Sequence, residues 1–250
     1  MKEFNLTRRQ RIRRTLLFIF LIAFPLTINY FSPYLIIDAA MQGIASFSFL
    51  LWTTWFVTSL IFGRASCGYF CPLGAGQESL HAMGDKPLVR VKVIRVLKYI
   101  IAAAWVGVIG FGVISSGGIK SVQPFYMTEN YVSIDSVFGV ILYVIVLSIA
   151  LLPAFFMGKR AFCHYLCPFG VLNIVGTKIG KFLHLPMLHL ETDTDKCTKC
   201  GKCNTVCQMT LPVREMVQAG GIDDVECILC GMCVDNCKFD AIHYAWKPEK

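Results

Sequence analysis

Twelve cysteines, grouped in four short clusters with none left over, constrain this 250-residue chain more than any other feature. Two clusters share the spacing C-x2-C-x2-C-x3-C, with nineteen residues between them, and two clusters farther upstream each read C-x3-C-P. The long runs are Cys197, Cys200, Cys203, Cys207 and Cys227, Cys230, Cys233, Cys237, and the paired cysteines are Cys67, Cys71, Cys163 and Cys167.

The two long runs predict two 4Fe–4S clusters. Their spacing is the thiolate ligand run of two-cluster bacterial ferredoxins, in which the fourth cysteine of each run ligates the other cluster. Chance seldom produces this spacing twice in one chain, so we predict iron–sulfur binding and a function in electron transfer. The expected ligands are Cys197, Cys200, Cys203 and Cys237 for one cluster, and Cys227, Cys230, Cys233 and Cys207 for the other.

The composition predicts a membrane protein. Hydrophobic residues make up 55% of the chain and charged residues only 16%, which is too apolar for an ordinary soluble domain. Four stretches are each about long enough to cross a bilayer as a helix, and the first is too long for a cleaved signal peptide. The four stretches are Thr15–Ile37, Ile44–Gly63, Leu97–Ser116 and Val137–Gly158.

The basic residues predict the orientation in the membrane. Six of them precede the first stretch, none lies in residues 32–43, and only Lys120 lies between the third and fourth stretches. By the positive-inside rule, both termini and all four cysteine clusters lie on the cytoplasmic side of a bacterial or archaeal cytoplasmic (inner) membrane. Such a reducing compartment suits thiolate ligation rather than disulfides. The net charge of +8 is thereby explained without a nucleic-acid partner.

An internal repeat links the two C-x3-C-P motifs. Residues 63–74 align with residues 159–170, ninety-six positions later, with Arg, Tyr, Cys-Pro and Gly in register. Each copy follows the second helix of an expected helical pair. We therefore predict two tandem helical hairpins in parallel orientation, related by an approximate two-fold axis along the membrane normal. That symmetry would bring the paired cysteines together.

The paired cysteines predict a metal site. On a helical turn, residues at i and i+4 have Cβ atoms roughly 5–6 Å apart, whereas a disulfide needs roughly 3.5–4.5 Å. Four thiolates are enough for a third 4Fe–4S cluster or a tetrahedral zinc, and they also suit Cu(I). Arg64 and Arg160 would offset the negative charge. The alternative is a set of buried structural or redox-reactive thiols without metal.

A quinone is the expected membrane substrate. All five histidines lie outside the four stretches and no C-x-x-C-H motif occurs, which excludes a bis-histidine haem in the bilayer and a c-type haem. Candidates for taking up quinol protons are Gln77, Glu78 and His81, which follow the first C-x3-C-P motif. A solvated helix face is the simpler interpretation of these three residues.

Charged residues of the C-terminal part have two interpretations. Lysines beside the ligand cysteines would offset the clusters' charge or are simply solvated, and the acidic segment from Asp223 to Glu226 is either a docking site or an ordinary polar loop. The lysines are Lys196, Lys199, Lys202 and Lys238.

These motifs together resemble the membrane-bound polyferredoxin family typified by the NapH subunit of periplasmic nitrate reductase systems. The likeness covers nearly the whole chain and includes the segment Cys-Gln-Met-Thr-Leu-Pro-Val at residues 207–213. The resemblance implies a quinol-oxidising (menaquinol or ubiquinol) component that passes electrons to an iron–sulfur or cytochrome partner of a respiratory complex. Whether the chain is itself an enzyme, as the quinol dehydrogenase subunit of such a complex, stays open.

Two departures from this pattern matter. Ferredoxin runs usually end in Cys-Pro, but Gln208 and Lys238 follow the fourth cysteines here. Larger relatives with these motifs include flavin-bearing regulators and a copper-handling assembly factor, whose additional domains have no room in this chain. The short form therefore favours the electron-donor subfamily. The alternatives are a metal-handling assembly factor of the cupric reductase kind and an iron–sulfur redox sensor.

The predicted architecture has two parts. Residues 1–190 form an all-α membrane domain of four transmembrane helices, and residues 191–250 form a small α+β ferredoxin domain with two clusters. Its expected surroundings are membrane lipid, the quinone pool and other redox subunits.

Overall fold

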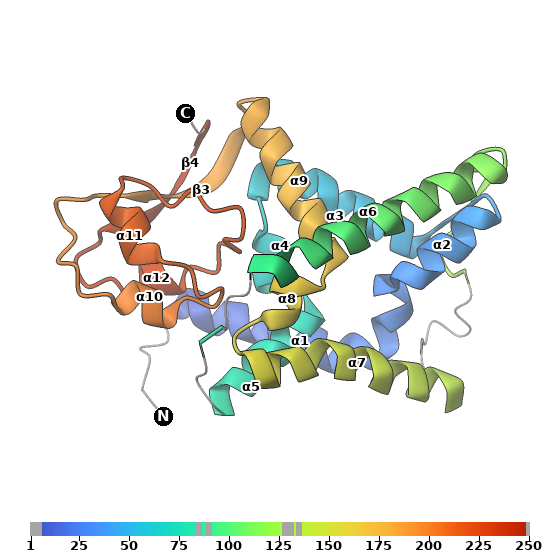
Figure 1. Cartoon of the computed structure of the whole chain (residues 1–250), viewed down its shortest axis with the longest axis horizontal. Coiled ribbons are helices and arrows are strands. Elements are labelled where there is room, and N and C mark those ends of the chain that lie inside the picture. The colour runs from blue at the N-terminus through green and yellow to red at the C-terminus, as the bar shows by residue number, and fades with distance from the viewer. Residues whose placement is uncertain (1–6, 84–86, 89–91, 127–132, 134–136, 249–250) are drawn as a thin grey trace.

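The computed structural model describes residues 7–248 except 84–86, 89–91, 127–132 and 134–136. A helical part and a cysteine-rich C-terminal part lie side by side (Figure 1). The described helices are α1 (Arg8–Phe31), α2 (Pro33–Met41), α3 (Phe47–Phe62), α4 (Ala65–Tyr69), α5 (Pro72–Met83), α6 (Lys92–Ser115), α7 (Val137–Met157), α8 (Ala161–Tyr165), α9 (Pro168–Phe182), α10 (Lys202–Val206), α11 (Val213–Gln218) and α12 (Met232–Asp235).

Three helical stretches are long and apolar enough to cross a membrane. The first runs through α1 and α2, which are separated only at Ser32, where the Ser32 hydroxyl caps α2 and Pro33 occupies its first turn. Many large apolar side chains of these stretches are exposed, as expected for a surface that faces lipid. The three stretches are Arg8–Met41, Val93–Ser115 and Gly139–Met157.

The fourth expected stretch is shorter than predicted. Ile44–Ser46 is strand β1, which pairs in parallel with β2 (Ser121–Gln123), and the Ser46 hydroxyl then caps α3. The remaining helix has 16 residues, or about 24 Å at 1.5 Å per residue, less than the roughly 30 Å of a bilayer core. Apolar composition continued across the β1–α3 junction, so the sequence did not reveal this boundary.

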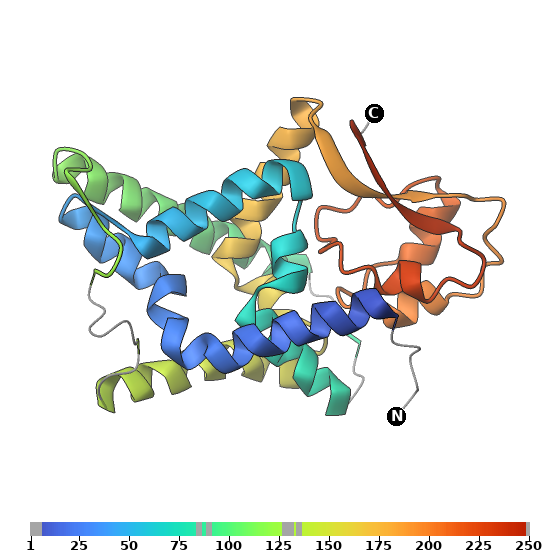
Figure 2. The same cartoon turned by 180° about the vertical axis from the view of Figure 1, so that it is seen from behind.

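The two halves of the helical part pack crosswise. Helix α9 of the second half lies against α3 of the first, and α5 of the first half lies against α7 of the second (Figures 1 and 2). Two glycines of α9 permit the first contact, because a Cβ on Gly176 or Gly180 would overlap Ser59 or the Leu60 carbonyl of α3. This crosswise packing brings the segment that follows α3 close to the segment that follows α7.

The C-terminal part combines one two-stranded sheet with short helices. Strands β3 (Pro186–Thr192) and β4 (Ile242–Pro248) pair in antiparallel fashion. Gly201 and Gly231 are the N-cap residues of α10 and α12, both at φ 72°, a conformation that glycine adopts without strain. The predicted domain boundary at residue 190 falls inside β3, which belongs with the C-terminal part through its pairing with β4.

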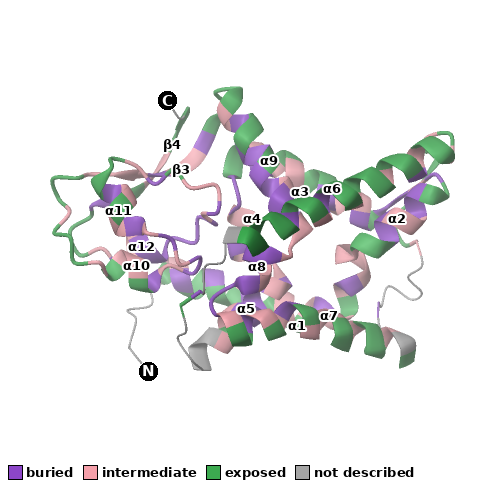
Figure 3. Cartoon of the chain, viewed as in Figure 1, coloured by how far each residue is buried: buried purple, intermediate pink, exposed green. Residues whose placement is uncertain are grey.

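One hydrophobic core joins the two parts. Trp52 and Phe169 of the helical part share it with Met209, Ile228 and other residues of the C-terminal part. Buried residues gather where α4, α8 and α9 face the cysteine-rich loops (Figure 3). The C-terminal part is therefore packed onto the ends of the helices rather than tethered by a linker.

Candidate metal centres

The C-terminal cysteines divide into two sets, each around its own cavity. The outer cavity, of about 370 Å³, opens at the surface. Three of its cysteines come from the first run and the fourth follows α12 in the second run. The cysteines that line it are Cys197, Cys200, Cys203 and Cys237.

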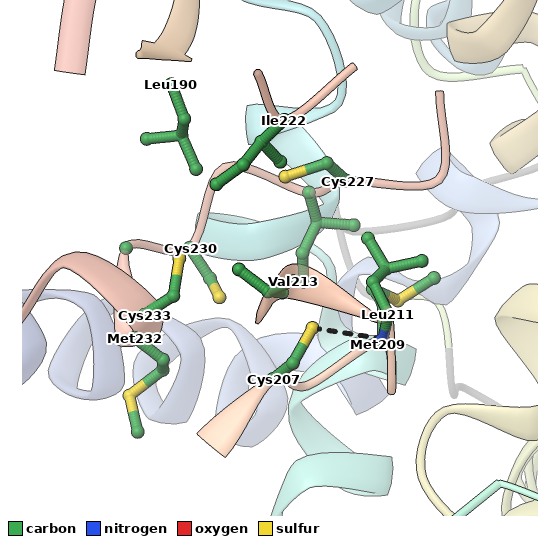
Figure 4. Close-up of a pocket in the computed structure, with 12 residues that line it drawn as sticks. Leu190, Cys207, Met209, Leu211, Val213, Ile222, Cys227, Cys230, Met232 and Cys233 are labelled. Atoms are coloured by element: carbon green, nitrogen blue, oxygen red, sulfur yellow. Dashed lines mark hydrogen bonds between the residues drawn. The ribbon is translucent and has the colours of Figure 1, made fainter. Parts of the chain in front are cut away.

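The inner cavity has the reciprocal composition. It measures about 20 Å³ and is lined by apolar side chains besides its cysteines (Figure 4). The amide N–H of Leu211 donates a hydrogen bond to Sγ of Cys207 over 3.4 Å, a contact typical of ligand sulfurs. The cysteines that line this cavity are Cys207, Cys227, Cys230 and Cys233.

The chemistry of these thiols fits iron–sulfur clusters. Burial raises the pKa of Cys207 to about 11 and that of Cys227 to about 12, so these thiols ionise at neutral pH only beside a strong positive charge such as a metal. In the described part of the chain, no three His, Cys, Asp or Glu side chains converge on one ion position. Each thiolate of a cubane binds a different iron atom, so cubane ligands stand farther apart than those of a single ion.

The paired cysteines lie in two matching turns. Cys67 lies in α4, Cys71 follows that helix, and Pro72 opens α5. The second motif repeats this order, with Cys163 in α8 and Pro168 opening α9. The i, i+4 argument assumed that the two cysteines of a motif share one helix face. They do not, because the second cysteine of each motif lies outside the helix that holds the first. Proline interrupts the helix, as expected, because it cannot continue the hydrogen-bond ladder.

Amide side chains join the two turns crosswise. Nε2 of Gln77 lies 3.3 Å from Sγ of Cys163, and Nδ2 of Asn173 lies 3.4 Å from Sγ of Cys67. Gln77 and Asn173 are themselves ninety-six residues apart, which is the offset of the repeat. Each amide belongs to one half and donates to the sulfur of the other half, so the contacts follow the internal symmetry.

The Glu226 network lies on one side of these thiols. The Glu226 carboxylate is 1% exposed and accepts hydrogen bonds from Arg64 and Lys98, and from half-exposed Arg95 over 3.2 Å. Burial alone would raise the pKa of Glu226, but the charges of Arg64 and Lys98 hold it at about 2. The acidic segment is thus not the ordinary polar loop that the sequence suggested, because Glu226 ties the C-terminal part to α6 and α4.

The Glu78 network is a second group of buried charges beside these thiols. Glu78 accepts hydrogen bonds from Arg13 and Arg160, and Arg160 also donates to the Cys67 carbonyl over 2.9 Å. Burial would raise the pKa of Glu78, but hydrogen bonds and charge from the two arginines hold it at about 2. A carboxylate this acidic is a poor acceptor for quinol protons, since a good base has a pKa near the working pH.

The three quinol candidates have different outcomes. Gln77 is completely buried and Glu78 is paired with arginines, so the interpretation as a solvated helix face is wrong for both. His81 lies in α5, but its side chain is outside the described residues. Asn173 was missed in the sequence, although extending the repeat by three residues beyond Gly170 would have matched it with Gln77.

The paired cysteines adjoin the inner cavity. A Cβ on Gly68, which follows Cys67, would lie 2.5 Å from the Ile228 carbonyl oxygen. His164, at the equivalent place in the repeat, contacts the Met209 carbonyl through Nε2 over 3.1 Å. Burial lowers the pKa of His164 to about 4, so it is neutral. The order in space is paired cysteines, inner cavity, outer cavity.

Comparisons with known proteins agree with this arrangement. A family model described as a 4Fe-4S binding domain matches twice, at residues 44–90 and 138–186, and a 4Fe-4S dicluster domain matches residues 189–238. The repeated match covers one pair of cysteines each time, and the dicluster match covers both long runs. No solved structure matches this chain.

Three relatives illustrate the similarity. An uncharacterised protein of Methanocaldococcus jannaschii is 28% identical over 205 residues, which cover 78% of this chain and 77% of that protein. YccM of Escherichia coli, named for electron transport, is 24% identical over 82% of this chain and 57% of its own length. The regulatory protein NosR of Pseudomonas aeruginosa is 26% identical over 74% of this chain but only 25% of NosR.

The fold, the cysteine sets and these matches define an iron–sulfur electron-transport protein associated with a membrane. Within that class, the chain belongs to the family of NapH-like membrane-bound polyferredoxins.

The Glu226 network generates the first prediction. The change Glu226→Gln leaves Arg64 and Lys98 buried without a carboxylate, and removing one partner of a buried pair costs about 3–5 kcal/mol. We expect the free energy of unfolding to fall by that amount, and proteolysis between the two parts to accelerate, in detergent-solubilised protein.

Asp223→Asn is the matched control for this prediction. Asp223 is 67% exposed and pairs with Lys181, and such a surface pair contributes about 0–1 kcal/mol. Equal effects of the two substitutions would contradict a structural role of the Glu226 network.

Proposed function

We propose that this protein is a quinol-linked electron carrier of the cytoplasmic membrane, the component that takes electrons from menaquinol or ubiquinol and passes them to a respiratory partner. The observation that carries the proposal is the contiguous order of cysteine sets, from the helices to an open surface. The proposal includes the membrane orientation that the basic loops indicate, in which both termini and the C-terminal part lie in the cytoplasm.

The ligand assignment is part of the proposal. Clusters in the outer and inner cavities would each take three cysteines from one run and the fourth from the other, as the lining of each cavity supports. When bound, such clusters supply one-electron redox chemistry. The chain's own residues hold the thiolates, exclude water from the inner site and place it beside the paired cysteines.

We also assign a metal centre to the paired cysteines, and buried charge supports it. The Glu226 network holds two cations of at most 1% exposure, and the Glu78 network holds two more, against one carboxylate in each. The two networks therefore contain two more buried cations than carboxylates, and two of these cations, Arg64 and Arg160, interact electrostatically with the paired cysteines. Four thiolates around a 4Fe–4S core or a zinc ion carry a net double negative charge. Neutral thiols would leave the excess cations uncompensated, which is costly in an apolar interior.

Unpartnered polar atoms around the paired cysteines support the same assignment. Nε of Arg64 and Arg160, Oε1 of Gln77 and Oδ1 of Asn173 are buried and have no hydrogen-bond partner among the described residues. The two arginine N–H groups are the kind of donor that sulfur ligands and cluster sulfides accept. All four atoms occur in pairs related by the repeat.

An aromatic cluster supports quinol binding near the same site. Phe169, two residues after Cys167, lies with its ring 5.0 Å from Trp52 and 4.6 Å from Trp55. The indole N–H of Trp52 is buried without an acceptor among the described residues. An aromatic surface with a free N–H donor suits the ring and oxygens of a quinone.

Iron content is expected to distinguish two clusters from three. Each cubane holds four irons, so we expect about twelve irons per chain rather than about eight. The change Cys67→Ser/Cys163→Ser would remove about four of them while the EPR signals of the other clusters persist. Retention of all iron would contradict the assignment, and copper in place of iron at these cysteines would support an assembly factor instead.

Quinol is expected to reduce the clusters in the purified protein. Anaerobic addition of a short-chain menaquinol or ubiquinol would produce reduced iron–sulfur signals in EPR. Reduction by dithionite but by neither quinol would contradict the quinol step while leaving electron transfer in place.

The crosswise amides are expected to set the potential of the paired-cysteine centre. Hydrogen bonds to ligand sulfur stabilise the reduced, more negative state. Gln77→Leu and Asn173→Leu would each lower the reduction potential by a similar amount, on the order of tens of millivolts, without loss of iron. Redox titration by EPR measures this shift. Gln218→Leu, at an exposed amide of α11, is the control, and unequal or absent shifts at the two repeat-related amides would contradict the symmetric role.

A further inference from the structure

The two C-terminal cavities face different surroundings. The inner cavity is lined by apolar side chains besides its cysteines, whereas four cationic side chains line the outer cavity and no carboxylate does, among the described residues. Cys200 at the outer cavity is exposed, while Cys230 and Cys233 at the inner cavity are buried. The cations are Lys196, Lys202, Arg214 and Lys238.

The loops around the inner cavity already contact the helical part. Gly68 packs on Ile228, and Gln10 of α1 donates to the Cys230 carbonyl over 2.9 Å. Glu226, next to Cys227, pairs with Arg64. Electrons that come from the membrane therefore reach the inner site first, and the outer site is the end of the path within this chain.

The two runs, offset by thirty residues, allow the two sites to be compared position by position. Both place a non-glycine residue at positive φ before the second cysteine, Lys199 at 59° and Leu229 at 49°, and both have glycine after it. At four equivalent positions the outer site carries lysine and the inner site does not. These positions are Lys196 and Glu226, Lys199 and Leu229, Lys202 and Met232, and Lys238 and Gln208.

This comparison separates ligation from surface chemistry. The inner set has the same cysteine spacing and the same turn geometry without any of these lysines, so holding a cluster does not require them. Lys196 pairs with Asp193 over 2.9 Å and Arg214 with Glu215 over 2.7 Å, whereas Lys199, Lys202 and Lys238 make no ion pair among the described residues. Phe239, beside Lys238, is 49% exposed. A positive rim around an exposed redox site, with an apolar residue in it, has the features of a docking surface.

We propose that the lysine rim of the outer cavity docks an acidic electron-transfer protein on the side of the membrane where the C-terminal part lies. The rim consists of Lys196, Lys202 and Lys238, which line the cavity, and Lys199, which precedes Cys200. This inference rests on the proposed function, since it requires the clusters. In the step, one electron leaves the reduced cluster held by the outer cysteines and reduces the partner's one-electron centre, with no proton or bond transferred. Opposite charge on the partner accelerates its encounter and orients it toward Cys200.

Two small oxidants, one anionic and one cationic, test whether electrons leave the protein at the basic outer cavity. The full-length protein in lipid nanodiscs is reduced with dithionite and mixed in a stopped-flow instrument with ferricyanide, an anion, or with tris(phenanthroline)cobalt(III), a cation. Ionic strength is raised from about 0.01 M to about 1 M, over which the screening length falls from about 30 Å to about 3 Å. We expect salt to slow oxidation by ferricyanide and to accelerate oxidation by the cobalt complex.

Charge reversal locates the effect. At low salt, Lys199→Glu/Lys202→Glu is expected to lower the ferricyanide rate at least about tenfold and to invert both salt dependences. Lys120→Glu/Lys178→Glu, at exposed lysines away from the rim, is the control with the same change in net charge. The reduction potential of the clusters is measured in each variant, so that the rates can be compared at equal driving force. Equal effects of the two double variants, or no salt dependence, would overturn the proposal.

A protein probe completes the test. A reduced sample is mixed with an oxidised acidic flavodoxin, and the rim variant is expected to lose at least about tenfold in rate at low salt while the control does not. An effect with ferricyanide but not with flavodoxin would overturn protein docking. Absence of clusters, or failure of quinol reduction, would instead count against the proposed function, and these outcomes are read separately by EPR before mixing.

Discussion

Buried positive charge beside thiol sulfur is the constraint on which the rest of this structure depends. Arg64 and Arg160 lie beside the paired cysteines, and both are almost fully buried. A guanidinium in such a place needs a carboxylate to hold it, and the chain supplies one for each, Glu226 and Glu78. Because Glu226 belongs to the C-terminal part, the ion pair that stabilises Arg64 also fixes the inner cavity against the helices.

The internal repeat determines how that site is assembled. Crosswise packing of α3 with α9 and of α5 with α7 brings the two C-x3-C-P turns together, and each half then donates an amide to the sulfur of the other. A single half would leave its amide without its sulfur partner, and Arg160 without the Cys67 carbonyl. The symmetry is incomplete, since Gly68 in one half and His164 in the other contact different loops of the C-terminal part.

A second repeat, within the C-terminal part, produces two unequal sites from the same cysteine spacing. One faces the helices and has an apolar lining with two buried cysteines, and the other faces outward and has a basic lining with an exposed cysteine. The difference comes from the residues between the cysteines and not from the cysteines themselves. A protein that relays electrons between a membrane and a partner benefits from such inequality, because each end meets a different environment.

The sequence by itself determined the cysteine sets, the internal repeat and the membrane character, because ligand spacing, residue identity at a fixed offset and apolar composition are local properties. It did not determine that Glu226 and Glu78 are buried ion-pair acceptors, that Gln77 and Asn173 donate to cysteine sulfurs of the opposite half, or that α3 is short. Glu226 lies 162 residues from Arg64, and no local pattern marks such a contact. Only tertiary packing decided these roles: the C-terminal part brings Glu226 to Arg64, and the packing of α5 on α1 and α7 brings Glu78 to Arg13 and Arg160. Burial then makes an ordinary surface carboxylate into the counter-charge of a buried arginine.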